Sequence, residues 1–172
     1  MVSLTVLECL NLNNRRTLAP MGEAKWLSDD EMAAWQAFLT AGALLDRRIE
    51  EQLKSEADLS HLQYEVLVRL SAAEGGELRM SELAGSVVTT KSGLTYQITQ
   101  LEKAGLVRRR SCAADVRGVY AVLTDAGRDR LRRAAPGHLG VVRAHLIDVL
   151  DGDQLRSLRE GLGEVVRRLS GG

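Results

Sequence analysis

Residues 88–124 constrain the fold of this chain most, because the sequence pattern there changes from helical to extended at a single glycine, Gly105. Before that glycine, apolar residues recur at the spacing of one helix face: Leu94, Ile98 and Leu101. Thr90 precedes them and is a candidate N-cap, because its hydroxyl can accept an N–H group of the first turn. Gly105 favours the left-handed conformation that ends many helices, and Leu106 stands where a Schellman motif would bring it onto Leu101. The pattern therefore predicts a capped helix that ends just before the glycine.

The opposite face of this helix carries small hydrogen-bonding or basic side chains: Lys91, Ser92, Thr95, Tyr96 and Thr99. Side chains of these kinds contact base edges and phosphates when a helix lies in the major groove of DNA. We therefore predict a DNA-contacting surface on the helix 90–104, beginning at Thr90. Contacts to base edges are assigned to three of these residues, namely Ser92, Thr95 and Tyr96. Contacts to phosphates are assigned to Lys91 and Thr99.

A basic hairpin is predicted after the glycine. Residues 106–110 and 119–123 have the composition of two strands, and residues 111–118 form the turn between them. Arginines 108–110 flank the turn, and Arg117 lies within it. A helix followed by a basic hairpin is typical of a winged helix-turn-helix, whose helix enters the major groove while the hairpin, or wing, reaches the backbone or the minor groove. We expect Arg117 to enter the minor groove and Arg110 to touch the DNA backbone.

The sequence LEKAGLVRRR, followed by DVRGVYAVLTDAG, resembles the MarR family of bacterial transcriptional regulators. Five residues match the wing signature of that family: Asp115, Arg117, Leu123, Thr124 and Gly127. The resemblance extends over about residues 26–169. It implies a mainly α (α+β) fold, in which a winged helix-turn-helix with a small β-hairpin wing joins a dimerisation layer of N- and C-terminal helices. Two positions depart from the family pattern: Arg79 replaces a common hydroxyl cap, and Lys91 replaces a common proline.

Local signals place the remaining elements of the fold. Two pairs have the spacing of a capping box, in which each member caps the other: Ser28 with Glu31, and Ser60 with Gln63. Asp151 and Gln154 are expected to open the last helix. We expect the first helix to end near Lys54 and the second at Gly75–Gly76. Residues 78–79 indicate a short third strand, and a short helix is expected over residues 81–86.

Thr124 is expected to cap a further helix that kinks or breaks at Pro136–Gly137, because proline lacks an N–H donor and clashes with the preceding turn. The chain is thereby divided into an N-terminal extension of uncertain order, a first helix in the dimerisation layer, the winged helix-turn-helix and the C-terminal dimerisation helices. These regions are residues 1–24, 25–58, 59–124 and 125–172. The role of the extension stays open, as does the choice of Met21 as the true start.

The terminal helices are longer and more apolar than a domain of this size needs, which indicates an isologous homodimer. The family resemblance implies the same arrangement. Two winged helices on a two-fold axis would meet major grooves roughly 34 Å apart, so we expect the operator to be an imperfect palindrome. The resemblance further implies a repressor that a small ligand or oxidation releases. Helices that only close an intramolecular core are the alternative.

The net charge of the chain is zero, but the charges are unevenly distributed. Residues 89–117 hold six basic and two acidic residues, a net of +4, whereas residues 23–65 hold four basic and ten acidic residues, a net of −6. The positive pole falls on the predicted DNA-contacting surface. A winged helix that binds protein instead of DNA is the alternative, and a steep salt dependence of duplex binding would exclude it. No sequence motif indicates an enzyme.

Candidates for ligand binding are few. The resemblance implies an effector pocket lined by Trp35, Phe38, His61 and Tyr64, although these four residues also suit an ordinary core. The three histidines (His61, His138 and His145) are too dispersed for a metal motif, so we expect neither metal nor cofactor. An oxidation switch at Cys9 or Cys112 is weighed against an incidental role for both cysteines. No apolar run has the length of a membrane span, and we expect a cytoplasmic protein.

Overall fold

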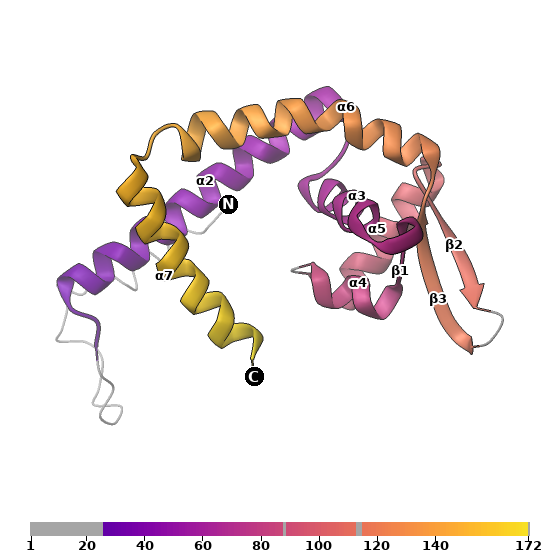
Figure 1. The fold of residues 1–172 in the computed structure, drawn as a ribbon, viewed down its shortest axis with the longest axis horizontal. Helices are drawn as coiled ribbons and strands as arrows, with labels where there is room; N and C mark the ends of the chain where they lie inside the picture. The colour runs from indigo at the N-terminus through magenta and orange to yellow at the C-terminus, as the bar shows by residue number, and fades with distance from the viewer. Residues whose placement is uncertain (1–25, 88, 113–114, 172) are drawn as a thin grey trace, which may run out of the picture. The chain divides into compact units, whose positions relative to one another are not determined.

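The structure, a computed structural model, describes residues 26–87, 89–112 and 115–171. The predicted N-terminal extension, with Cys9 and Met21, lies outside these residues. The chain divides into two units, Met1–Leu39 and Thr40–Gly172. Its described elements follow in this order (Figure 1): α2 (Asp29–Ala57), α3 (His61–Ala72), η2 (Glu74–Gly76), β1 (Glu77–Arg79), α4 (Met80–Ser86), α5 (Lys91–Lys103), β2 (Val107–Cys112), β3 (Asp115–Leu123), α6 (Asp125–Val142), η3 (Arg143–Ile147) and α7 (Gly152–Ser170). The mainly helical class with one small antiparallel sheet is confirmed.

Both predicted capping boxes, at Ser28 and Ser60, are present, and Asp151 forms a third. At α2 the Ser28 N–H donates to Glu31 Oε2 at 2.7 Å, and the Glu31 N–H donates to Ser28 Oγ at 3.2 Å. The same reciprocal bonds begin α3 and α7. They satisfy donors that the first helical turn leaves without partners. α2 continues three residues beyond the predicted end at Lys54, because its buried face extends to Ala57.

α5 ends at Gly105 in the predicted Schellman motif. Gly105 has a φ of 72°, in the left-handed region that glycine adopts without steric cost. The Leu106 N–H donates to the Leu101 carbonyl at 2.9 Å, and the Gly105 N–H donates to the Glu102 carbonyl at 3.0 Å. Both bonds satisfy helix carbonyls and turn the chain sharply into β2.

The sheet has the strand order β1-β3-β2, with all pairs antiparallel. The hairpin of β2 and β3 is longer than predicted. Its strands were expected to leave residues 111–118 as a turn, but Ser111 pairs with Val119 and Cys112 with Asp115, across an irregular register. The added ladder satisfies main-chain donors and acceptors that a long open turn would leave to water. The short third strand is confirmed as β1.

α4 begins at Met80, with Arg79 in the N-cap position. An arginine side chain has no acceptor, so only half of a capping box forms: the Arg79 N–H donates to Glu82 Oε2 at 3.2 Å. The guanidinium turns instead to the sheet, where its Nε donates to the Tyr120 hydroxyl at 2.9 Å. The departure from a hydroxyl cap therefore leaves the helix in place and gives the side chain another partner.

Of the two alternatives predicted at Pro136–Gly137, the break is wrong, whereas the kink stays a prediction. α6 runs without interruption from Asp125 to Val142, and the irregular π-helical turn η3 comes only after it. Pro136 is exposed, so its ring lies away from the core. Gly137 lies against α2 so closely that a Cβ atom on it would come within 2.3 Å of Gln52 Nε2. We attribute the continuity of α6 to this packing on α2, which offsets the hydrogen bond that proline cannot make.

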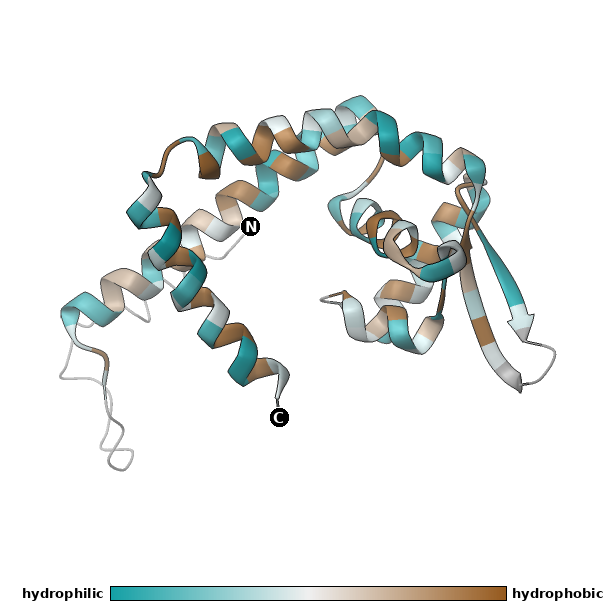
Figure 2. Ribbon diagram, in the orientation of Figure 1, coloured by the Kyte–Doolittle hydropathy of each residue, from teal (hydrophilic) through white to brown (hydrophobic). Residues whose placement is uncertain are grey.

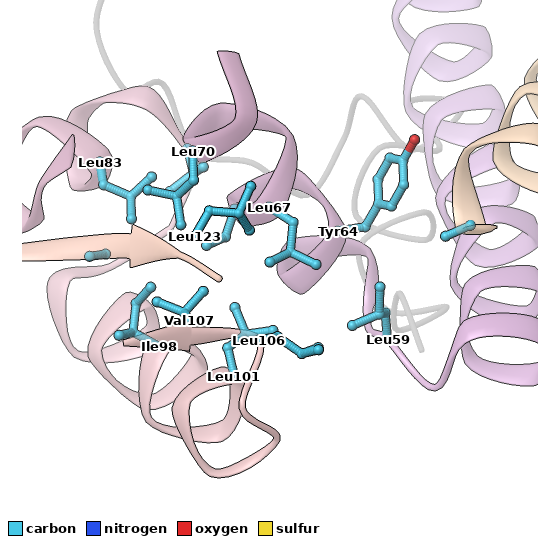
Figure 3. Close-up of a cluster of buried hydrophobic side chains, with 14 of the residues drawn as sticks. Leu59, Tyr64, Leu67, Leu70, Leu83, Ile98, Leu101, Leu106, Val107 and Leu123 are labelled. Carbon is cyan, nitrogen blue, oxygen red and sulfur yellow. The ribbon is translucent and has the colours of Figure 1, made fainter. Parts of the chain in front are cut away.

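A leucine-rich core joins α3, α5 and the sheet (Figure 3). The predicted apolar face of α5 is fully buried within it, as are Leu67 and Leu70 of α3. Tyr64 is the aromatic residue of this cluster and is 8% exposed. Removing a buried leucine from such a core typically costs about 2–5 kcal/mol, so this cluster fixes how α5 sits on the sheet.

α7 has no buried residue among those described, although apolar and polar residues alternate along it (Figure 2). Its exposed apolar residues are Leu162, Val165, Val166 and Leu169. In the first unit, the apolar residues that are exposed are Trp26, Leu27, Trp35, Phe38 and Leu39. No helix in the described ranges combines the length and apolarity that crossing a bilayer requires.

Candidate nucleic-acid interface

The helix predicted to enter the major groove is α5. It begins at Thr90, whose hydroxyl accepts the Gly93 N–H at 3.0 Å, as predicted. Four of the predicted contact residues are exposed on it: Lys91, Ser92, Thr95 and Tyr96. Tyr96 is the largest of these and is 61% exposed, although an aromatic ring normally favours burial. The buried leucine face and this polar face make α5 a rigid platform with its donors turned outward.

Two threonine hydroxyls of α5 have different hydrogen-bonding capacity. Thr95 Oγ1 donates to the Lys91 carbonyl at 2.9 Å and keeps its acceptor sites. Thr99 Oγ1 donates to the Thr95 carbonyl at 2.9 Å and also accepts from Arg109 Nη2 at 2.9 Å. Thr99 is half-buried, and its hydroxyl already has both a donor and an acceptor partner. Of the two predicted contacts, Thr95 is therefore the more available to a nucleic acid.

The three consecutive arginines of β2 have three different environments. Arg109 forms an ion pair with Glu102 of α5, with Nη1 2.6 Å from Glu102 Oε2. Arg110 forms an ion pair with Glu77 of β1, with Nε 3.2 Å from Glu77 Oε2. Arg108 is exposed and has no ion-pair partner among the residues that the structure describes. The prediction that residues 108 and 110 share one face of the strand agrees with these environments, because Arg109, between them, is the arginine that pairs with α5.

Arg110 also lies over the ring of Tyr120, with its Cζ 4.7 Å from the ring centroid. Tyr120 stands between Arg110 and Arg79 in the register of the sheet, and Arg79 Cζ is 5.5 Å from the same ring. A guanidinium is attracted to an aromatic face at these distances. Sequence reasoning missed Tyr120 and Glu77: pairing the predicted strands 106–110 and 119–123 residue by residue would have placed Val119, and not Tyr120, opposite Arg110.

A cleft of about 720 Å³ separates α5 from the wing. Its lining comes from β1, α4, α5 and both wing strands: Arg79, Met80, Ser81, Thr95, Thr99, Arg109, Gly118 and Val119. The cleft therefore joins the predicted helix surface to the base of the wing. Asp115 and Arg117 belong to β3 and Cys112 to β2, but the side chains of these three residues are outside the described part of the structure.

The residues predicted to line an effector pocket fall into two groups. Trp35 and Phe38 stack with ring centroids 6.1 Å apart and are exposed in the first unit. His61 and Tyr64 both lie on α3, where a third ring, His138 of α6, joins them. The His138 centroid is 4.5 Å from that of Tyr64 and 6.1 Å from that of His61. Sequence spacing gave no sign of this approach, because His61 and His138 are 77 positions apart.

Burial shifts the pKa values of two residues of this ring cluster, His138 and Tyr64, in opposite directions. It lowers the pKa of His138, and the neighbouring His61 lowers it further. Burial also raises the pKa of Tyr64. His138 Nδ1 is buried and has no hydrogen-bond partner within the described ranges. His61 has one, because its Nδ1 lies 2.7 Å from Asp46 Oδ1. The described residues contain no group of three or more histidines, cysteines and carboxylates that could hold a metal ion.

A capped helix with outward donors, followed by an antiparallel hairpin that carries arginines, defines a winged helix-turn-helix protein of the kind that binds DNA. The model of the MarR family matches residues 59–119. The structure of AbsC, a MarR family transcriptional regulator from Streptomyces coelicolor, is 41% identical with a TM-score of 0.81, over 87% of this chain and all of that one. The chain belongs to the MarR family of transcriptional regulators.

Two further comparisons agree with this assignment. Sco3205, a MarR family regulator from Streptomyces coelicolor whose structure was determined in complex with DNA, is 40% identical with a TM-score of 0.80, over 84% of this chain and 94% of that one. The HTH-type transcriptional regulator YfiV of Bacillus subtilis is 30% identical over 147 residues, 83% of this chain and 87% of the relative. Family, relatives and fold are those of transcriptional regulators.

Proposed function

We propose that the protein is a homodimeric repressor that binds an imperfect palindromic operator near the genes it controls. In this proposal α5 lies in the major groove, and the wing between β2 and β3 reaches the minor groove. The exposed polar face of α5 carries the proposal, because a helix held rigidly by a leucine core has its donors and one large aromatic ring turned to solvent. The DNA complex of a relative 40% identical to this chain supports the same use of the fold.

The residues proposed to contact DNA are those of the sequence prediction: Thr90, Lys91, Ser92, Thr95, Tyr96, Thr99, Arg110 and Arg117. The exposed face of α5 supports base contacts by Ser92, Thr95 and Tyr96. Arg108 joins the set as a phosphate contact, since it is exposed on β2 and shares a strand face with Arg110. Cations on such a surface displace counterions from DNA, so affinity falls steeply as salt is added.

Dimerisation is supported by apolar surface that one protomer leaves exposed. The apolar residues of α7 and of the first unit are in contact with water in the single chain. Burying apolar surface stabilises association by about 25 cal/mol per Å² before the entropic costs of binding. A two-fold pairing of these helices would place two copies of α5 on successive major grooves, which is why a palindrome is proposed.

Release by a small effector is proposed at the ring cluster of α3 and α6, with Trp35 and Phe38 as further candidates. The cluster contains two of the predicted effector residues, His61 and Tyr64, and a buried nitrogen on His138 that lacks a partner in the described part of the chain. A ligand that binds better to a shape unable to span two grooves would shift the population away from DNA. Oxidation of Cys9 or Cys112 is the other proposed trigger.

The test is selection of bound sequences from random duplexes by the full-length protein, followed by titration of the selected duplex at several salt concentrations. The proposal predicts enrichment of an inverted repeat and a steep loss of affinity with salt. Candidate ligands and peroxide are then competed against the bound duplex. Absence of enrichment, with no binding at low ionic strength, would exclude the operator-binding function and favour a winged helix that binds protein.

A further inference from the structure

Arg109 lies along α5 and contacts one row of that helix. Its main-chain N–H donates to Glu102 Oε1 at 3.1 Å, and its Nη1 donates to Glu102 Oε2 at 2.6 Å. Its Nη2 donates to Thr99 Oγ1 at 2.9 Å and to the Thr95 carbonyl at 3.3 Å. Residues 95, 99 and 102 follow one another on a single helix face. One side chain of the wing is therefore attached along about two turns of α5.

The contact between Arg109 and Glu102 fixes the position of the wing strand relative to α5. Both oxygens of Glu102 are engaged by the same residue, one by its main chain and one by its guanidinium. Hydrogen bonds between charged groups are stronger than neutral ones, and paired bonds also fix direction. The two side chains are only 30% and 37% exposed, so water competes less for them than for a surface pair.

The base of the wing is fixed by the core, in which Leu106, Val107 and Leu123 are buried, and by the pairing of β3 with β1. The chain passes from α5 to β2 through three residues, 104–106, and the cleft lies between the outer part of the hairpin and the helix. Arg109 is part of the lining of this cleft. Without this side chain, the part of the hairpin beyond the core would lose its hydrogen bonds to α5 and could change its angle to that helix, while the leucine core stayed intact.

We propose that Glu102 and Arg109 form a brace that sets the spacing between the wing and the recognition helix, and that Arg109 is a positioning residue and not a phosphate contact. This inference rests on the proposed DNA binding. A helix and a wing must reach neighbouring grooves together, and preorganisation of both surfaces avoids an entropic cost on binding. In this proposal the neighbouring Arg108, which is exposed, contacts a DNA phosphate, whereas Arg109 holds the wing at a fixed angle to α5.

The substitution Glu102→Gln separates the two possible roles by the sign of its effect. If Glu102 only withheld Arg109 from DNA, the variant would bind the operator more tightly. A brace predicts the opposite, because a neutral amide cannot accept both bonds with the same strength and the wing loses its fixed angle. We expect operator affinity of the full-length variant to fall about tenfold, because the complex must then order the wing on binding.

The salt dependence distinguishes positioning from phosphate contact. Each phosphate contact contributes about 0.9 to the slope of log affinity against log salt. Arg108→Gln is expected to lower that slope by about this amount. Arg109→Gln is expected to lower the affinity while the slope stays that of the wild type. Glu74→Gln is the matched control for charge, since Glu74 is exposed in η2 and the substitution removes one carboxylate without touching the brace.

A measurement without DNA keeps this inference separate from the proposed function. Amide hydrogen exchange of the free protein is expected to be about tenfold faster in β2 and β3 of Glu102→Gln than in the wild type, with α5 and the thermal unfolding temperature nearly unchanged. Faster wing exchange in a protein that binds no duplex would refute the proposed function and leave the brace standing. Unchanged wing exchange, tighter operator binding by Glu102→Gln, or a reduced salt slope for Arg109→Gln would each overturn the brace.

Discussion

Gly127 of α6 lies so close to the main-chain carbonyl of Leu106 that a Cβ atom on it would come within 2.1 Å of that oxygen. Thr124, three residues earlier, donates its N–H to the same carbonyl at 3.2 Å and its hydroxyl to the Gly105 carbonyl at 2.8 Å. The end of the recognition helix, the end of the wing and the start of α6 therefore meet at one point. This meeting explains why the wing signature closes in leucine, threonine and, three residues later, glycine.

Substitution of Gly127 by alanine should destabilise the fold, because the added methyl group meets backbone that cannot turn away. Overpacking of this kind typically costs about 1–3 kcal/mol. Urea unfolding monitored by circular dichroism measures the loss. Gly140→Ala in the same helix is the control, since a Cβ atom there meets nothing within 4 Å. It should be neutral or stabilise by about 0.5–1 kcal/mol, and equal losses in both variants would contradict the proposed contact.

Tyr96→Ala should change which operator sequences are preferred, whereas Arg117→Ala should weaken binding to all of them. Tyr96 is exposed on the helix face assigned to base edges, and Arg117 is assigned to the wing by its place in the sequence. A lost base contact typically costs about 1–3 kcal/mol at one position of the site. Binding of the two variants to a panel of single-base operator changes measures both effects. Wild-type affinity of Arg117→Ala in moderate salt would show that the wing assignment is wrong.

Glu77→Gln should have the opposite effect from Glu102→Gln. Glu77 pairs with Arg110 on the face of β2 that turns away from α5, and the carboxylate competes with DNA phosphate for that guanidinium. Its removal should raise duplex affinity about two- to tenfold at low salt and steepen the salt dependence. Fluorescence anisotropy with a labelled operator measures both quantities. A weaker complex would mean that Glu77 orients Arg110 for DNA.

Acidification should destabilise the protein through His138. Burial holds the pKa of this imidazole below its ordinary value of about 6.5, so the unfolded chain binds the proton more readily than the folded one. Stability is therefore fully present above the unfolded pKa and falls as the pH is lowered from about 6.5 toward the folded pKa. His138→Phe, which keeps a ring against Tyr64, should show a shallower pH dependence of the unfolding temperature. His145→Gln, at an exposed position, should retain the wild-type dependence.

Local sequence signals predicted those features that depend on neighbours within four residues. The caps at Ser60, Thr90 and Asp151 and the glycine end of α5 are of this kind, because one side chain and one helical turn determine each. The break predicted at Pro136 was wrong because packing against α2, more than 80 positions away in sequence, decides whether the helix continues. Local pattern alone carries no information about such a contact.

In the candidate site, too, local features could be predicted from the sequence and contacts between distant residues could not. Alternation along β2 predicted that Arg109 differs from its two neighbours, but not that Glu102 and Glu77 would take one arginine each. Those partners depend on the angle between the hairpin and the helices, which the leucine core sets. The ring cluster of His61, Tyr64 and His138 likewise exists only because α6 crosses α3 at that point.

The account depends on two copies of one helix-and-wing surface acting together on DNA. The most direct test is the mass of the complex that the purified protein forms with its selected duplex at low ionic strength, measured by analytical ultracentrifugation. We predict two protomers on each palindromic duplex and a complex that dissociates steeply as salt is added. A monomer that leaves the duplex unbound at low ionic strength would contradict the account.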